Sequence, residues 1–169
     1  VLKEASVLDV LLRRPEVEVV KAIHYRQYDT YFLFKDETQG RFRYREDELI
    51  DSKGAAQSVR SRITFTMPTK EREFNSTILL SHSRFIADAN QSLRFYREYF
   101  RPESERELHK DRWRWHIKFN GVLFYINLDR VTKPELAGLF IEIKSRTWSA
   151  RDAENKAAQI EEMLGILGI

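Results

Sequence analysis

The sequence contains no cysteine, and this absence excludes both disulfide frameworks and thiolate metal sites. A chain without disulfides fits a reducing compartment, and we expect a cytoplasmic protein. Internal repeats, low-complexity segments and linker-like stretches are also missing. At 169 residues, the chain is therefore expected to form a single domain over residues 1–169 with a sizeable core.

Long apolar runs are missing as well. None approaches the ~20 residues that span a bilayer. Lys3, Glu4 and Asp9 interrupt any apolar start of the signal-peptide kind. We therefore expect no association with a membrane. The sequence begins at Val1 rather than Met, so the possibility of a first strand upstream of residue 1 stays open, as does the oligomeric state.

The chain also lacks a strong excess of charge of one sign. Its 29 basic and 26 acidic residues leave a net charge of only +3, so the arrangement of charge carries more information than its sum. With 42% hydrophobic and 12% aromatic residues, the composition excludes a disordered chain.

What the sequence has in abundance is alternation of polar and apolar side chains, which predicts strands. The predicted strands are residues 17–34, 41–46, 60–67, 72–81, 107–119, 122–131 and a run over 139–144. Helical spacing predicts helices over residues 2–14, 84–100 and 149–167, the last with Ser149 as its N-cap. A loop is expected over 48–57, and Asn120-Gly121 is a strong hairpin signal. Together these elements predict an α+β protein, with an antiparallel sheet or barrel against helices.

Several predicted strands place cations together on one face. The groups are Arg43 with Arg45, Arg60 with Arg62, Lys110 with Arg112 and Arg114, and more weakly Lys133 with Lys144. Asp129 and Glu142 place carboxylates on the corresponding faces of two further strands. Such faces are ordinarily solvated. If they instead face inward, like-charge repulsion favours an anion between them, and polyphosphate suits the donors of Arg and Lys. The carboxylates would suit Mg²⁺ or Mn²⁺.

Four fragments resemble the CYTH domain, also called the triphosphate tunnel metalloenzyme family. Residues 27–32 (QYDTYF) are similar to its Q-x-D-x-Y-F strand, and residues 42–46 (FRYRE) to its L-R-x-R-E strand. Residues 110–115 resemble its K-x-R-x-x-Y strand with Trp115 for Tyr. Residues 129–131 (DRV) and 138–143 (GLFIEI) resemble its closing segment. Together they cover most of the chain, from about Gln27 to Lys144.

The resemblance implies a closed antiparallel barrel, or tunnel, of about eight strands with flanking helices. It further implies that a triphosphate is gripped by Arg43, Arg45, Lys110 and Arg112, with Arg60 and Arg62 as further cations. Lys110 and Arg112 would serve catalysis, and Asp129 and Glu142 would bind Mg²⁺ or Mn²⁺. The expected activity is metal-dependent hydrolysis of inorganic, nucleoside or thiamine triphosphate.

The chain departs from the family's pattern in three places. The family opens with an E-x-E-x-K strand, which Glu16-Val17-Glu18 imitates only as the start of an alternating strand. The closing E-x-E reads Glu142-x-Lys144, which replaces a metal ligand by a cation. Thr66 stands where a tunnel lysine is expected. Two of these departures affect the metal, so anion binding is better supported than hydrolysis.

Other functions therefore stay open. The same scaffold cyclises ATP in the family's adenylate cyclases, and a non-catalytic polyphosphate- or nucleotide-binding module of a larger protein is the main rival. Nucleic-acid binding is disfavoured because Trp113 and Trp115 fall on the strand face opposite Arg112 and Arg114. These aromatic side chains are expected in the core.

Overall fold

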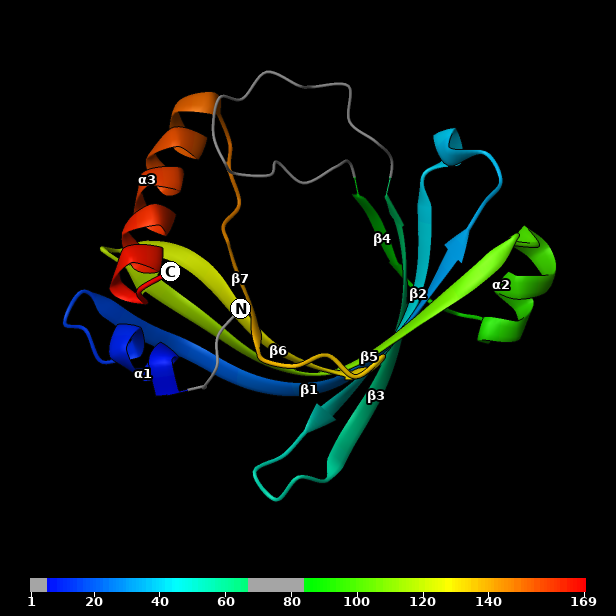
Figure 1. Ribbon diagram of the computed structural model, residues 1–169, viewed down its shortest axis with the longest axis horizontal. Helices are drawn as coiled ribbons and strands as arrows, with labels where there is room; N and C mark the ends of the chain where they lie inside the picture. The colour runs from blue at the N-terminus through cyan, green and yellow to red at the C-terminus, as the bar shows by residue number, and fades with distance from the viewer. Residues whose placement is uncertain (1–5, 67–83) are drawn as a thin grey trace. The chain divides into compact units, whose positions relative to one another are not determined.

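The computed structural model describes residues 6–66 and 84–169 (Figure 1). Within these residues it is an α+β structure whose seven strands follow the hydrogen-bonded order β4-β3-β2-β1-β5-β6-β7. The strands are β1 (Val17–Leu33), β2 (Arg41–Ile50), β3 (Ala56–Thr66), β4 (Arg84–Asp88), β5 (Ser104–Phe119), β6 (Val122–Lys133) and β7 (Phe140–Lys144). The helices are α1 (Ser6–Leu12), α2 (Leu93–Phe100) and α3 (Ala150–Ile166), with a short 3-10 helix over Glu37–Gln39.

The order of strands is open: among the described residues, β4 and β7 are its ends and do not pair with each other. The antiparallel sheet and the flanking helices are thus confirmed. The strand predicted over 72–81 and the last residue of the one predicted over 60–67 lie outside the described residues.

Contacts group the chain into two compact units. Unit 1 consists of Val1–Tyr25, Asp111–Val131 and Leu136–Ile169, and unit 2 of Arg26–Lys110 and Thr132–Glu135. Each of the long strands β1 and β5 therefore contributes one part to unit 1 and the other part to unit 2.

The core of unit 1 lies between its helices and one face of β5 and β6. It joins buried side chains of the two helical segments to alternate residues of the two strands: Leu8, Leu11, Met163 and Leu167 with Ile117, Phe119, Phe124 and Ile126. The alternation that buries these strand residues sends Lys118 and Asn127 to the opposite face. The strands are joined at Asn120 and Gly121, whose φ angles of 49° and 79° match the primed hairpin turn that this dipeptide predicts.

Helix α3 begins where the sequence predicts. The Ser149 hydroxyl accepts a hydrogen bond from the Asp152 backbone N–H at 3.2 Å, and the Asp152 carboxylate accepts one from the Trp148 N–H at 3.0 Å. These bonds satisfy backbone donors that the first helical turn leaves unpaired. The predicted N-cap and helix are confirmed. The helix predicted over 2–14 is observed as Ser6–Leu12, with residues 2–5 outside the described part.

The core of unit 2 is aromatic. Phe32 of β1 and Phe42 and Tyr44 of β2 are buried against Tyr96 of α2, and Phe100 packs on the same cluster. Ring centroids of Phe42 and Phe100 lie 4.6 Å apart. These aromatics alternate along β1 and β2 with Asp29, Arg43 and Arg45, so the charged side chains lie on the other face.

Two predictions in unit 2 are wrong at their boundaries or in type. The loop over 48–57 is shorter, because Glu48 and Leu49 continue the ladder opposite Val59 and Ser58. The helix over 84–100 begins only at Leu93, since residues 84–88 form β4 and pair with β3. In a stretch this short, helical and strand periodicity overlap, and the hydrogen bonds offered by the edge of β3 favour a strand.

Candidate anion-binding site

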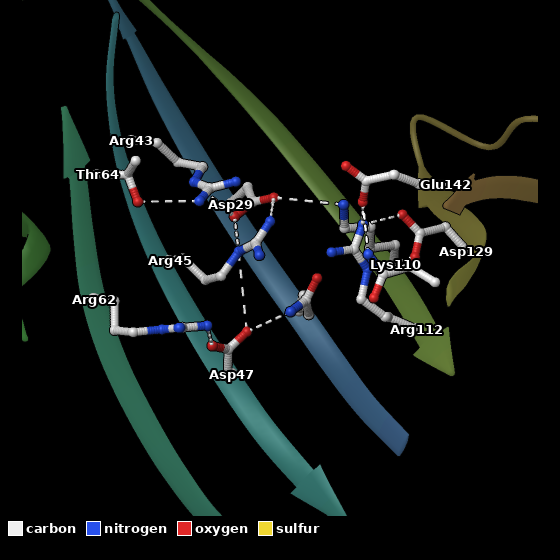
Figure 2. A network of polar contacts seen from close by, with 12 residues as sticks. Asp29, Arg43, Arg45, Asp47, Arg62, Thr64, Lys110, Arg112, Asp129 and Glu142 are labelled. Atoms are coloured by element: carbon white, nitrogen blue, oxygen red, sulfur yellow. Dashed lines mark hydrogen bonds and ion pairs between the residues drawn. The ribbon is translucent and has the colours of Figure 1, made fainter. Parts of the chain in front are cut away.

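In unit 2, a network of charged and amide side chains covers the sheet face opposite the aromatic core (Figure 2). β1 supplies Gln27 and Asp29, and β2 supplies Arg43, Arg45 and Asp47. β3 adds Arg62 and Thr64, and β5 adds Lys110. The register sets this network, because Arg45 pairs with Arg62 and Arg43 with Thr64 across β2 and β3. Cations from β2 and β3 therefore meet on one face.

Asp29 is the centre of this network. Its two carboxylate oxygens each accept a 2.5 Å hydrogen bond from Arg45, and both side chains are almost completely buried. Arg43 Nε lies 3.7 Å and Lys110 Nζ 4.0 Å from the same carboxylate. Burial opposes ionisation, but the bonds and charge of Arg45, together with Arg43 and Lys110, outweigh it and lower the pKa of Asp29. One carboxylate thus holds three cations together.

Asp47 is the second carboxylate of the network. It accepts hydrogen bonds from Gln27 Nε2 at 2.6 Å and from Arg62 Nη2, and Arg45 Nε lies 3.9 Å from it. Asp29 and Asp47 together face four cations: Arg43, Arg45, Arg62 and Lys110. The network therefore carries an excess of positive charge.

Some buried polar atoms of this network have no hydrogen-bond partner among the described residues: Arg43 Nε, Arg62 Nε and Gln27 Oε1. Arg43 donates to Thr64 Oγ1 at 3.0 Å and lies over the Tyr31 ring, 5.9 Å from its centroid. Burial and the nearby Arg45 charge lower the pKa of Arg43. A buried donor without a partner costs about 1–3 kcal/mol. A bound anion that accepts from these guanidinium groups would remove that cost.

Unit 1 has a polar network on β5, β6 and β7. Arg112 donates to both oxygens of Asp129, at 2.6 and 2.5 Å, and both residues are buried. Asn127 is fully buried: its Nδ2 donates to Glu142 Oε2 at 2.6 Å, and its Oδ1 accepts from Arg114 Nε at 2.7 Å. The sequence prediction that Arg112, Asp129 and Glu142 lie on one face is consistent with this arrangement (Figure 2).

Glu142 is held as an anion by two cations. Lys144 Nζ lies 3.1 Å and Arg112 Nη2 3.7 Å from its Oε2. Burial raises the pKa of Glu142, but Lys144, Arg112 and the Asn127 hydrogen bond outweigh burial and lower that pKa to about 2. The side chain is half-exposed, so solvent screens part of this effect.

Asp129 and Glu142, the two predicted metal ligands, do not fit a divalent cation in the arrangement observed. Both oxygens of Asp129 accept from Arg112, and Glu142 Oε2 is shared between Asn127 and Lys144. Over residues 6–66 and 84–169, no three His, Asp or Glu side chains form a group able to hold a metal ion. Magnesium and manganese need several such oxygen ligands with accessible lone pairs. The geometry therefore lends no support to Asp129 and Glu142 as metal ligands.

Other residues discussed in the sequence take different positions. Arg60 pairs with Asp88, and both side chains are mostly exposed. Glu16 and Glu18 pair with Arg14 and Lys118 at the start of β1, as expected for an alternating strand start. Thr66 ends β3 opposite Arg41.

Sequence reasoning assigned no role to the side chains that hold the cations in place. Asp29, Asp47, Gln27 and Asn127 are all buried, at 5% exposure or less. A signal for Asp29 and Gln27 was present, since they share the odd-numbered face of β1 and lie within the fragment QYDTYF. A similar signal was present for Asn127, because it alternates with the apolar Ile126 and Leu128 and so falls on the polar face of its strand.

The two tryptophans of β5 are partly buried and pack against a small core cluster of unit 1, on the strand face that the sequence predicts. Trp113 and Trp115 pack against Leu128 and Leu139. The His24 ring stacks on Trp113 with centroids 4.7 Å apart, and the Arg130 guanidinium lies over the same indole. Their position leaves the cationic face of β5 without stacked tryptophans.

Comparison with known proteins gives a fold but no family. No model of a known protein family matches the chain, and no curated protein matches it. The chain is similar to the solved structure of the PH1819 protein from Pyrococcus horikoshii OT3, with a TM-score of 0.66 at 17% identity. It is also similar to a conserved hypothetical protein from Pyrococcus furiosus, with a TM-score of 0.59 at 20% identity. Each match covers 98% of this chain and 86% of the other.

At such identities the two matches show a shared fold alone. In the part of the chain that the structure describes, no helix is long and apolar enough to cross a membrane. By these two matches, the chain shares its α+β fold with the two Pyrococcus proteins over 98% of its length.

Proposed function

We propose that this protein binds a triphosphate-containing anion through the cationic network of unit 2. The observation that carries the proposal is the excess of cations around Asp29 and Asp47, with the Nε atoms of Arg43 and Arg62 buried and without a hydrogen-bond partner in the described part of the chain. Phosphate oxygens accept bidentate hydrogen bonds from guanidinium groups and point-charge contacts from Lys110. The buried carboxylates keep the cations in place before the ligand arrives.

A polyphosphate suits this network better than a small monovalent anion. Four cations against two carboxylates leave a surplus that a single negative charge does not neutralise. Inorganic, nucleoside and thiamine triphosphates all follow from the resemblance to the CYTH domain. Closure of the sheet into a tunnel of about eight strands, and a cytoplasmic location, are parts of the same proposal.

Hydrolysis is the second activity that we propose to test. Lys110 and Arg112 of β5 are the two cations to which the resemblance to the CYTH domain assigns catalysis. Cations in such positions would stabilise charge that develops on a transferred phosphoryl group. Metal-dependent hydrolysis at Asp129 and Glu142 stays a prediction, and the contacts of these carboxylates favour the binding module over the hydrolase.

Calorimetric titration with tripolyphosphate in EDTA tests the binding proposal. We expect saturable binding, with sulfate at equal ionic strength binding much more weakly. No binding of tripolyphosphate, or equal binding of sulfate, would refute it. Phosphate release from inorganic, nucleoside and thiamine triphosphates, with Mg²⁺ and with Mn²⁺, tests hydrolysis in the same preparation. Absence of release from every substrate would exclude the hydrolase and leave the binding module.

A further inference from the structure

We infer that Lys144 and Arg112 are built-in counter-cations of Asp129 and Glu142, so that anion binding by this protein needs no divalent metal. This inference rests on the proposed function for its anion, but its main test uses metal alone. It concerns the polar network of β5, β6 and β7 in unit 1.

The first argument is the occupation of the carboxylate oxygens. Arg112 donates to both oxygens of Asp129, which is the bidentate arrangement that makes guanidinium–carboxylate pairs strong. Lys144 Nζ lies 3.1 Å from Glu142 Oε2, and Asn127 donates to the same oxygen at 2.6 Å. A cation entering between these carboxylates would have to displace donors that are already in place.

The second argument is electrostatic. The contacts described above join three cations, Arg112, Arg114 and Lys144, to two carboxylates, Asp129 and Glu142. Its surplus is therefore one positive charge before any ligand binds. An incoming divalent cation would meet net repulsion, whereas an incoming phosphate group would meet net attraction.

The third argument is the position of Lys144 on its strand. Lys144 and Glu142 are two residues apart on β7, so they share a face, and across the sheet they pair with Tyr125 and Asn127 of β6. A carboxylate at position 144 would stand beside Glu142 in place of a cation. The change would remove two units of positive charge from the network, which one divalent cation restores.

Lys144→Glu is therefore the decisive variant, and Mn²⁺ alone is the probe. We expect the wild-type protein to leave the electron paramagnetic resonance signal of free Mn²⁺ unchanged. Lys144→Glu should bind Mn²⁺ at least ~10-fold more tightly, because carboxylate number strongly tunes the affinity for hard cations. Lys144→Gln, which removes the counter-cation without adding a carboxylate, should fall between the two.

The matched control is Lys118→Glu in the same unit. Lys118 pairs with Glu18 at 3.0 Å, and both side chains are largely exposed. This variant also converts a lysine beside a glutamate into a second carboxylate, but Lys118, although on β5, pairs with Glu18 of β1 and not with Asp129 or Glu142. We expect no gain in Mn²⁺ affinity. A gain equal to that of Lys144→Glu would show unspecific binding and overturn the inference.

The second measurement is the affinity for tripolyphosphate in EDTA. Wild-type protein should bind tripolyphosphate in EDTA with the same Kd as in the presence of Mn²⁺, because the carboxylates of the unit 1 network already have cations as partners. Tight Mn²⁺ binding by the wild type would overturn the inference even if neither variant folds. The inference would also be overturned if Lys144→Glu is folded, as judged by circular dichroism, but shows no gain in Mn²⁺ affinity.

These outcomes separate the inference from the proposed function. If Lys144→Glu gains a Mn²⁺ site but no protein binds tripolyphosphate, the proposed function fails while the assignment of the counter-cations stands. If the wild type binds tripolyphosphate only when Mn²⁺ is added, the claim of metal independence fails while the proposed function stands.

Discussion

Replacement of Arg43 by methionine isolates the anion-binding role of one cation from its role in the fold. Arg43 donates to Thr64, interacts with Tyr31 and lies 3.7 Å from Asp29, whose charge Arg45 already pairs through two hydrogen bonds. Loss of Arg43 therefore leaves the buried carboxylate of Asp29 compensated. Methionine keeps much of the side-chain volume, so we expect a stable fold with a change in unfolding free energy of about 1 kcal/mol.

The expected effect on binding is larger. A hydrogen bond to a charged group contributes about 1.5–3 kcal/mol, which corresponds to roughly a 10- to 150-fold rise in Kd for tripolyphosphate. The buried Nε of Arg43 donates no hydrogen bond to any described residue, so no hydrogen bond of that atom is lost when it donates to the ligand. Calorimetric titration in EDTA gives the Kd, and urea denaturation gives the stability.

Arg60→Met is the matched control for this variant. Arg60 is on the neighbouring strand and its removal subtracts the same formal charge, but it is exposed and pairs with Asp88. Because both side chains of the Arg60–Asp88 pair are mostly exposed, solvent screens their charge. We expect less than about a twofold change in Kd. An equal loss for Arg43→Met and Arg60→Met would refute a defined site, and an unchanged Kd for Arg43→Met would refute the assignment of that cation.

Further predictions concern the stability of unit 2 and the network around Lys144. Asp29→Asn removes the carboxylate that accepts two hydrogen bonds from the buried Arg45 guanidinium and leaves Asp47, at 3.9 Å, as the nearby carboxylate of the network, so urea denaturation should show a loss of about 3–5 kcal/mol. The exposed Arg94–Glu98 pair supplies a control, Glu98→Gln, with a change of about 0–1 kcal/mol. Because the folded-state pKa of Asp29 is lowered, the stability it contributes is fully present above its ordinary pKa of about 3.9 and is lost as the pH falls through the folded-state pKa. Urea midpoints should therefore fall below pH ~4 in the wild type and fall less in Asp29→Asn; parallel curves would contradict this. Lys144→Glu should gain Mn²⁺ affinity while Lys118→Glu does not, as argued from their different surroundings.

Alternation predicts which face of each strand is charged, and here it succeeds. Arg43 and Arg45 alternate with Phe42 and Tyr44, and the structure buries both aromatics in the core of unit 2. The reason is physical: a strand with one apolar face loses stability if it turns that face to water. The same argument placed Ile117 and Phe119 in the core of unit 1.

Which charges pair with which was not predictable from the local sequence. The Arg112–Asp129 pair depends on the pairing of β5 with β6. The Arg62–Asp47 pair likewise depends on the register of β3 against β2. Registers are set by turns and by packing of whole strands. This limit matters for Asp129: the sequence predicts a metal ligand, whereas the structure pairs its carboxylate with Arg112.

Strand β4 shows a second limit of prediction from sequence, namely that periodicity in a short segment does not fix its type of secondary structure. Residues 84–88 have apolar side chains at Phe85 and Ile86, and both are mostly exposed. A short stretch of this kind satisfies helical and strand templates equally well. Pairing with β3, a long-range contact, decides in favour of the strand. Only the following residues, from Leu93 onwards, keep the predicted helix.

The central claim is that guanidinium groups of unit 2 bind phosphate oxygens directly. Titration of tripolyphosphate into ¹⁵N-labelled protein in EDTA, followed through the arginine Nε–Hε resonances, tests it most directly. We expect large, saturable shifts for Arg43 and Arg62, whose buried Nε atoms lack a hydrogen-bond partner among residues 6–66 and 84–169, and small ones for Arg60. Shifts confined to exposed arginines such as Arg60 and Arg94, or no shifts at all, would contradict it.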